Sequence, residues 1–414
     1  MELDKLVLSK AFRGGKTVVL LITLAIFILL IVWGTVDFKL GIKQQRREAK
    51  RYVQEIRNGQ CELITTGHDL FKKLIDDIHN AEHHIHMLFY IFRDDHIGTQ
   101  VLKALQEKAE EGVPVRLLVD RLGCHLSKKS IKKLRKAGVH FSHSHPPKFP
   151  YWFFTLNRRN HRKITVIDGH IGYIGGYNVG DEYLGRDPKF GDWRDIHLRI
   201  KGDGVQDLQG QFLQDWSVAT KEKISEKKYY PPLAKGLHQL KIVPSDGAFL
   251  EEAFLKLIKE AKTSIYIGTP YFIPGNEIKT QLIEAAKRGV DVKLIVPKQG
   301  DHPLVKEAAF PYFQPLIEAG CEIYRYYQGF YHAKTIVIDK EVCDIGTANV
   351  DRRSFHINHE INCLIFNREF IKEVIAIMEY DIVNSELLTI EQLQNRSLFH
   401  KSKERLATTF GPLL

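Results

Sequence analysis

The first long hydrophobic run of the chain lies near its start. Residues 17–36 read TVVLLITLAIFILLIVWGTV, and none of these twenty residues is charged. At about 1.5 Å per residue, a helix of this length spans about 30 Å, the thickness of a bilayer's hydrocarbon core. The pattern predicts a transmembrane helix over 17–36 after an N-terminal tail over 1–16. A cleaved signal peptide is the alternative, which the length of the run and the lack of a small-residue cleavage pattern after it disfavour.

Helical spacing and short β-branched runs alternate beyond residue 60. The stretches with helical spacing of apolar residues are 69–80, 99–111, 248–261 and 276–288. The β-branched runs are 115–119, 164–167, 292–296 and 335–338. Such alternation is typical of α/β folds whose sheets are largely buried. The pattern therefore predicts an α/β fold.

The two halves of this α/β region repeat each other. Ala81–Tyr90 corresponds to Ala261–Tyr271, and Gly112–Val119 corresponds to Gly289–Val296, in the same order. The period is far longer than that of solenoid repeats, so the repeating unit is a whole lobe. We predict two similar lobes with a linker that contains the turn-forming sequence KKYYPP. The predicted segments after the membrane helix are a juxtamembrane segment 37–59, lobe 1 over 60–224, the linker 225–236, lobe 2 over 237–400 and a tail 401–414.

Net charge narrows the choice of partner. The chain has 60 Lys and Arg residues against 50 Asp and Glu residues, a net charge of +10. Residues 1–51 carry ten of these basic residues and four acids, and the other 363 residues carry a net charge of only +4. We therefore expect no nucleic-acid partner. The basic juxtamembrane segment 37–59 either lies against anionic membrane headgroups or forms an ordinary solvated helix face.

The orientation of the predicted single-pass membrane protein follows from its flanking charges. Four Lys and Arg residues precede the apolar run and six follow it within fifteen residues, which favours a cytoplasmic position for the longer C-terminal part. The five cysteines are odd in number and include no C-x-x-C pair. This usage argues against a disulfide scaffold and a structural zinc site, and it agrees with a reducing compartment.

Each predicted lobe carries the same short polar motif. The two copies are His161, Lys163, Asp168 and Asn178 in lobe 1, and His332, Lys334, Asp339 and Asn349 in lobe 2. In both copies Lys comes two positions after His, Asp five positions after Lys and Asn ten positions after Asp. On a strand, residues two apart share a face, so each His and Lys can reach one ligand. One copy alone is a weak signal, but two copies with equal spacing indicate a catalytic site.

The residue types in the two motifs suit phosphodiester chemistry. One neutral histidine can attack phosphorus while the other, protonated, gives its proton to the leaving alkoxide, and an incoming hydroxyl then releases the phosphohistidine. The lysines neutralise phosphate oxygens, and Asn178 and Asn349 add donors at glycine turns. The symmetry of the two copies leaves the assignment of nucleophile and acid open.

Carboxylates are also needed, because a histidine is held in one tautomer when a carboxylate accepts a hydrogen bond from its other ring nitrogen. Asp195 and Glu360 follow the two motifs and are the predicted histidine-orienting residues. Asp168 and Asp339 belong to the candidate catalytic set as motif members. We expect these two aspartates to brace the loop after each motif strand.

These motifs and their flanks resemble the phospholipase D superfamily and, within it, the bacterial cardiolipin synthases. The segments that carry the resemblance are 157–163, 175–187, 193–195, 270–274 and 346–355. The resemblance implies two phospholipase D-like α/β lobes that share one active-site cleft. It implies an enzyme, a phosphatidyltransferase, that joins two phosphatidylglycerol molecules to give cardiolipin and glycerol without a metal or other cofactor. It also implies that His161 is the nucleophile and His332 the acid.

Other functions stay open beside this one. The same mechanism could use water, serine or ethanolamine as the acceptor, because pocket shape and water exclusion decide the acceptor. A nuclease could use the same residues, although the near-neutral lobes and the membrane span disfavour it. A catalytically silent membrane scaffold is disfavoured by the intact motifs. The pattern leaves the oligomeric state open.

Three smaller features have alternative interpretations. The aromatic stretch 149–154 is either an acyl-chain entrance on the bilayer or ordinary core packing. The tail 401–414, basic and then apolar, either docks on the membrane or in the cleft, or is a frayed end. His83, His84 and His86 are predicted to be surface or pocket-lining residues rather than metal ligands.

Overall fold

The computed structural model describes residues 2–52, 54–225, 227–302 and 304–411. Met1 of the predicted N-terminal tail, the side chains of residues 2–17, one residue of the predicted linker and the last three residues of the predicted C-terminal tail lie outside the described residues. The chain forms two compact units. One comprises the chain up to Glu48 together with 147–157, and the other comprises 49–146 and the chain from Arg158 onward.

The first unit is built on one long helix, α1 (Glu2–Glu48). Its large apolar side chains between Val18 and Val36 are exposed. By length and composition, Val18–Glu48 is a helix that could cross a membrane. The structure thus has a helix over the predicted span 17–36, and this helix continues on both sides of it.

The other part of this unit is the short helix α5 (Trp152–Asn157), which packs on α1. The Phe38 ring lies 6.1 Å from the rings of both Phe153 and Phe154, and the Phe154 N–H donates to the Asp37 carboxylate at 2.8 Å. Phe149, in contrast, is 79% exposed. The aromatic stretch 149–154 is therefore packed against α1 at Phe153 and Phe154 and exposed at Phe149.

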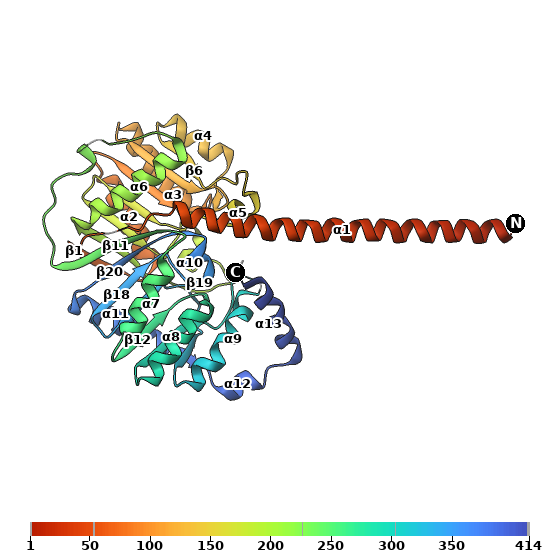
Figure 1. Ribbon diagram of the computed structural model, residues 1–414. Coiled ribbons are helices and arrows are strands. Elements are labelled where there is room, and N and C mark those ends of the chain that lie inside the picture. The colour runs from red at the N-terminus through yellow and green to blue at the C-terminus, as the bar shows by residue number, and fades with distance from the viewer. Residues whose placement is uncertain (1, 53, 226, 303, 412–414) are drawn as a thin grey trace. The chain divides into compact units, whose positions relative to one another are not determined.

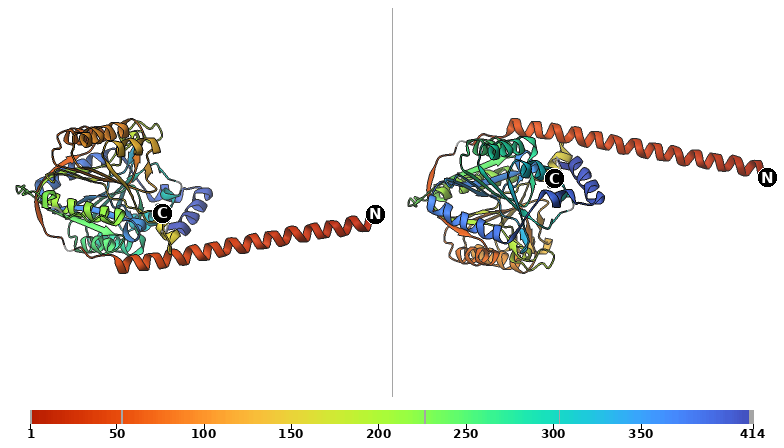
Figure 2. Two further views of the ribbon diagram at one scale, coloured as in Figure 1. Left: turned by 90° about the horizontal axis from the view of Figure 1, so that it is seen from above. Right: turned by 90° about the horizontal axis from the view of Figure 1, so that it is seen from below.

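A single mixed sheet of fifteen strands runs through both lobes of the second unit (Figures 1 and 2). In spatial order its strands are β21 (Ser385–Leu387), β15 (Glu322–Tyr326), β14 (Asp291–Pro297), β12 (Ser264–Gly268), β17 (Thr335–Ile338), β18 (Val342–Gly346), β20 (His359–Ile365), β11 (His238–Asp246), β1 (Arg57–Ile64), β10 (His197–Gly202), β8 (Ile171–Gly175), β7 (Ile164–Ile167), β2 (Ile85–Phe89), β4 (Val115–Asp120) and β6 (His140–Ser144).

The strand order repeats outward from the centre of this sheet. Strands β1 and β11 pair antiparallel, with Arg57 opposite Leu240, and join the lobes edge to edge. From β1 the order is β10, β8, β7, β2, β4, β6, and from β11 it is the matching β20, β18, β17, β12, β14, β15. In each lobe the last three of these strands are parallel to one another and the others pair antiparallel. The predicted duplication and the α/β fold class are both confirmed.

Helices cover both faces of the sheet. On one face, α6 (Gly204–Thr220) and α11 (Arg368–Val383) pack into a core that is continuous across the two lobes. On the other face, α2 (Gly67–His79) and α3 (His96–Glu110) cover lobe 1, and α7 (Leu250–Glu260), α8 (Gly275–Lys287) and α9 (Val305–Glu318) cover lobe 2. Each of the eight stretches predicted from periodicity corresponds to one of these helices or strands, with the helix ends shifted by one to three residues.

Shorter elements complete the unit. They are β3 (Phe92–Arg93) paired with β5 (Cys124–His125), β9 (Trp193–Arg194) paired with β16 (Phe330–Tyr331), β13 (Phe272–Ile273) paired with β19 (Val350–Asp351), the 3-10 turns η1 (Asp181–Leu184) and η2 (Lys227–Tyr229), and the helices α4 (Lys128–Lys136), α10 (Arg352–His356), α12 (Ile390–Gln394) and α13 (Leu398–Phe410). Helix α13 contains most of the predicted tail, and its Ala407 packs with Ile273 and Ala308.

Two of the three neighbouring histidines are buried, which corrects the expectation of surface or pocket-lining residues. His84 and His86 are 1% and 0% exposed, because they lie just before and within the interior strand β2, under α6. The Oε1 atom of Gln209 in α6 lies 3.1 Å from His84 Nε2 and 3.2 Å from His86 Nδ1. The Gln209 Nε2 atom also lies 2.8 Å from His86 Nδ1. The pair is therefore a buried polar cluster that shares one glutamine side chain, although His84 Nδ1 has no hydrogen-bond partner among the described atoms.

Candidate active site

The two histidine motifs lie at the same edge of the sheet. His161 and Lys163 come directly before β7, and His332 and Lys334 come directly before β17. Strands β7 and β17 run antiparallel to β2 and β12, so they begin where those strands end. Both motifs therefore lie at the carboxyl edge of the parallel strands, where α/β sheets place their ligands.

Backbone hydrogen bonds between the lobes bring the two histidines together. The His161 N–H donates to the carbonyl of His359 at 2.9 Å, and the His332 N–H donates to the carbonyl of Arg194 at 2.7 Å. The short parallel strands β9 and β16, which pair next to the His332 hydrogen bond, extend this contact between the lobes. Each motif histidine is thus attached to a strand of the opposite lobe.

The carboxylate partners are exchanged in the same way. His161 Nδ1 lies 2.8 Å from Glu360 Oε2, and His332 Nδ1 lies 2.5 Å from Asp195 Oδ2. Glu360 belongs to lobe 2 and Asp195 to lobe 1, so each lobe supplies the carboxylate for the other lobe's histidine. Because Nδ1 is engaged in both rings, Nε2 is the nitrogen that can face a substrate. In His332 this atom lies 3.2 Å from Lys334 Nζ, so a substrate would replace that contact.

Both carboxylates are fully buried and held ionised. Burial alone would raise the pKa of Glu360, but His161, Lys163 and the Thr347 hydroxyl, which donates at 2.6 Å, hold it below its ordinary value. The pKa of Asp195 is likewise lowered, because Lys334 and His332 outweigh the effect of burial. Two ionised carboxylates therefore accept from the Nδ1–H groups of the two rings.

The pKa values of both motif histidines are lowered to about 4. For His161 the main cause is burial, opposed by Glu360. For His332 burial and Lys334 lower the value, and Asp195 opposes them. Neutral imidazoles are the state needed for attack on phosphorus, and the negative charge of a bound phosphodiester favours the protonated state needed for acid catalysis.

The two lysines are buried beside their histidines. Lys163 Nζ donates to the His161 carbonyl at 2.8 Å, and Lys334 Nζ donates to the His332 carbonyl at 2.5 Å. Burial lowers the pKa of Lys163 to about 7 and that of Lys334 to about 8. An anionic phosphate between the histidines would stabilise the charged ammonium groups and so be bound by them.

The other motif residues divide between the cleft and the scaffold. Asn178 and Asn349 line the cleft, and their Nδ2 atoms already donate to the Tyr183 hydroxyl at 3.2 Å and to Asp351 at 3.1 Å. Asn349 Oδ1 is buried without a hydrogen-bond partner among the described atoms.

The structure does not bring Asp168 and Asp339 to the cleft. The Asp168 carboxylate accepts from the backbone N–H groups of residues 82–84 at 2.7–2.9 Å. The Asp339 carboxylate accepts in the same way from those of residues 262–264 at 2.7–3.1 Å. Each aspartate therefore braces the turn that leads into the neighbouring strand β2 or β12.

A cleft of about 670 Å³ contains the two histidines and residues that sequence reasoning did not select. The Tyr90 ring lies 5.0 Å from the His161 ring, and the Trp193 ring lies 4.8 Å from the His332 ring. Tyr271 and Arg159 also line it. The alignment of the two halves, which matches Tyr90 with Tyr271, is the signal that could have found the tyrosines. Among the described residues, no three His, Cys, Asp or Glu side chains gather as a metal site.

Arg162, between the two motif residues of lobe 1, points away from the cleft and is fully buried. Its Nε donates to the Glu360 carbonyl at 3.0 Å, Nη1 to Asp215 at 2.7 Å and Nη2 to Asp246 at 2.6 Å. Tyr52 adds a hydrogen bond to Asp246 at 2.7 Å. Arg162 therefore holds the backbone of the residue that orients His161.

The fold and the site together define a two-lobe phospholipase D-like enzyme. A family model described as "Cardiolipin synthase, PLD-like domain" matches residues 74–216 and 254–382. The chain is 43% identical over 398 residues to the "Minor cardiolipin synthase ClsB" of Bacillus subtilis, covering 96% of this chain and 99% of that protein. It is also 43% identical over 360 residues to "Cardiolipin synthase 2" of Staphylococcus epidermidis, covering 85% and 74%.

A solved structure shows the same fold. The phosphatidylserine synthase of Haemophilus influenzae matches with a TM-score of 0.67 at 15% identity, over 90% of this chain and 100% of that one. The chain belongs to the PLD-like cardiolipin synthase family. Membership of this family makes it a phosphatidyltransferase.

Glycine at position 176 makes room for the Asp195 carboxylate, and this contact generates a prediction. A Cβ atom at Gly176 would lie 2.0 Å from Asp195 Oδ1. We expect Gly176→Ala to displace the carboxylate and lower kcat about 100-fold, because His332 loses its fixed orientation. Steady-state turnover of phosphatidylglycerol vesicles measures the loss.

The matched control is Gly210→Ala in α6. A Cβ atom there would have the Tyr230 hydroxyl as its nearest neighbour at 3.7 Å, an ordinary contact. This variant is expected to keep wild-type turnover. Equal turnover of the two variants would contradict the positioning role of Asp195.

Proposed function

We propose that the protein is a cardiolipin synthase that transfers a phosphatidyl group between two phosphatidylglycerol molecules through a phosphohistidine. The observation that carries the proposal is the exchanged pairing, in which two neutral imidazoles meet in one cleft, each beside a buried lysine and with its Nδ1 held by a carboxylate. The names of the relatives support this substrate and product.

In the first step, His161 Nε2 attacks the phosphorus of the donor. The bond between phosphorus and the headgroup glycerol oxygen breaks, and His332, protonated at Nε2, gives its proton to that oxygen as glycerol leaves. Lys163 and Lys334 neutralise the phosphate oxygens, on which negative charge accumulates in the transition state. Glu360 stabilises the cation that forms on the His161 ring.

In the second step, His332 takes a proton from a headgroup hydroxyl of a second phosphatidylglycerol. The freed oxygen attacks phosphorus, the bond between phosphorus and His161 Nε2 breaks, and cardiolipin forms. His161 returns to its neutral state and His332 to its protonated state, so the cycle is closed. The two steps use the same groups in reverse order, as microscopic reversibility requires.

The assignment of His161 as the nucleophile rests on the family resemblance, because burial and lysine charge lower the pKa of both motif histidines alike. Lys163 and Lys334 both act to lower the pKa of His161, beside the larger effect of burial. A lowered pKa favours the unprotonated ring that can attack phosphorus. The phosphate-binding role of Asn178 and Asn349 and the orienting role of Asp195 and Glu360 belong to the same proposal.

The membrane provides both substrates. Helix α1 would anchor the chain as a single-pass protein, with the lobes on the cytoplasmic side by the distribution of basic residues. Six basic residues between Lys39 and Arg51 would lie near anionic headgroups, each contributing about 1 kcal/mol of attraction.

Removing either histidine tests the mechanism. We expect His161→Ala and His332→Ala to lower cardiolipin formation in phosphatidylglycerol vesicles by about 10³-fold or more, because each ring bears an essential proton or bond. Mass spectrometry of the lipids measures cardiolipin, released glycerol and phosphatidic acid. His170→Ala, at an exposed turn outside the cleft, is the control and is expected to keep full activity.

A donor that needs no proton separates the two roles. A phosphatidyl ester of para-nitrophenol releases a stable anion, so His332→Ala is expected to give a burst of nitrophenolate equal to the enzyme concentration, and His161→Ala none. A burst in His161→Ala would reverse the assignment. Phosphatidic acid as the main wild-type product would make water the acceptor and reject the synthase.

The rate is also expected to depend on pH. As pH rises, Lys163 and Lys334, with pKa values lowered to about 7 and about 8, lose the charges that bind phosphate. These changes have the same sign, so kcat/KM for phosphatidylglycerol should fall from about pH 6 to about pH 9. A rise over this range would contradict the role of the lysines.

A further inference from the structure

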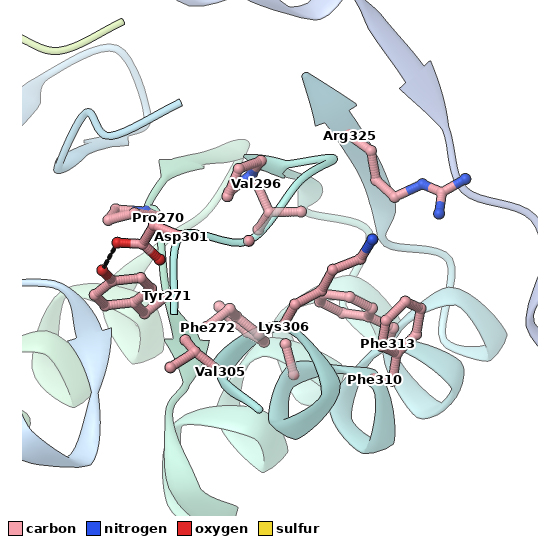
Figure 3. Close-up of a pocket in the computed structure, with 13 residues that line it drawn as sticks. Pro270, Tyr271, Phe272, Val296, Asp301, Val305, Lys306, Phe310, Phe313 and Arg325 are labelled. Atoms are coloured by element: carbon pink, nitrogen blue, oxygen red, sulfur yellow. Dashed lines mark hydrogen bonds between the residues drawn. The ribbon is translucent and has the colours of Figure 1, made fainter. Parts of the chain in front are cut away.

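Asp301 lines the catalytic cleft and has no role in the two-histidine chemistry. Asp301 lies in the loop between β14 and α9, at the carboxyl edge of the parallel strands. It lines the cleft and also a smaller neighbouring cavity whose walls include Phe272 and Phe313 (Figure 3). Its side chain is only 8% exposed. A buried carboxylate beside a site for an anionic phosphate needs a physical reason, because the two charges repel.

The carboxylate is held in place by hydrogen bonds. The Tyr271 hydroxyl, from the loop after β12, donates to Asp301 Oδ2, and the dashed line in Figure 3 marks this bond. The backbone N–H of His302 donates to Oδ1 at 2.8 Å. Asp301 is therefore a fixed acceptor in the wall of the cleft.

The equivalent edge of lobe 1 is neutralised by an arginine. There Asp120 ends β4, and Arg159 Nη1 donates to it at 2.9 Å. In the described part of the chain, the ion-pair partner of Asp301 is His302 at 3.5 Å, and the His302 side chain is 69% exposed. Asp120 accepts a hydrogen bond from Arg159 within the protein. Asp301 can thus still accept hydrogen bonds from a ligand.

Asp301 lies on the His332 side of the cleft. Lys189 Nζ donates to the Asp301 carbonyl at 3.2 Å, and the ring of the next residue, Phe190, lies 5.5 Å from the Trp193 ring that packs on His332. Asp301 acts to raise the pKa values of His332 and Lys334, against the larger lowering by burial. His332 is the proposed acid that protonates the leaving glycerol and then deprotonates the incoming headgroup. The hydroxyl-bearing part of both molecules must therefore occupy the side of the cleft that Asp301 lines.

We propose that Asp301, held by Tyr271, binds the free hydroxyls of the glycerol headgroup. The ligand is a glycerol unit, either esterified or free. It is the headgroup of the donor before glycerol leaves, and the headgroup of the acceptor before its hydroxyl attacks. A carboxylate accepts from hydroxyls and repels a second phosphate, so it places the reacting oxygen at His332 Nε2. This inference rests on the proposed function and explains why the enzyme would use a glycerol headgroup as its acceptor.

Competition between two soluble acceptors tests the subsite. Full-length protein in phosphatidylglycerol vesicles is given equal concentrations of deuterated glycerol and 1-propanol, and mass spectrometry measures the ratio of labelled phosphatidylglycerol to phosphatidylpropanol. We expect the wild type to favour glycerol and Asp301→Ala to reduce that preference about tenfold or more, because buried polar groups reject ligands that leave them unpaired. This ratio does not depend on how much of the enzyme is folded.

Further variants refine the test. Asp301→Asn, which keeps one accepting oxygen, is expected to give an intermediate ratio, and Tyr271→Phe a smaller change in the same direction as Asp301→Ala. Asp291→Ala, exposed at the other end of β14, is the control and is expected to match the wild type. The ratio of cardiolipin to phosphatidic acid should fall together with the glycerol preference in Asp301→Ala.

The outcomes separate this inference from the proposed function. An unchanged glycerol preference in Asp301→Ala, with cardiolipin still formed, would overturn the subsite and leave the synthase intact. A wild-type preference for ethanolamine over glycerol would also overturn it, since the carboxylate would then select a cation. Absence of any cardiolipin from the wild type would reject the synthase itself.

Discussion

Each motif histidine is oriented by a carboxylate of the opposite lobe, and this exchange ties the chemistry to the docking of the two lobes. Glu360 holds His161 and Asp195 holds His332, while the backbone N–H of each histidine donates to a carbonyl of the opposite lobe. Neither lobe could fix the tautomer of its own histidine alone. The edge-to-edge pairing of β1 and β11 makes the two lobes one sheet, so the positions of all four side chains are set by a rigid scaffold.

Burying so many charges is costly, and the structure compensates by pairing them. Arg162 is surrounded by two carboxylates and two carbonyls, and the lysine and histidine of each motif lie beside an ionised carboxylate. Well-packed apolar residues would often be at least as stable at such positions. The buried charges instead support the proposed reaction, for which a dry site would strengthen the interaction between ammonium groups and phosphate.

The two lobes differ from each other in side chains that line the cleft. Tyr90 and Tyr271 occupy matching positions, yet Tyr90 packs on His161 while Tyr271 donates to Asp301. At the carboxyl edge of the parallel strands, Arg159 neutralises Asp120 in lobe 1, whereas Asp301 in lobe 2 lines the cleft. This asymmetry supports the proposal that one half holds the phosphoryl group and the other the hydroxyl-bearing groups that enter and leave.

The sequence alone determined the apolar helix, the α/β alternation, the duplication and the paired motifs, because periodicity and repetition are written into short local stretches. It also named both orienting carboxylates. Only the tertiary structure decided which carboxylate serves which histidine, since these contacts join residues 199 and 137 positions apart. The burial of His84 and His86 and the placement of Asp301 likewise depend on which elements pack together, and that is a property of the assembled sheet rather than of any single stretch.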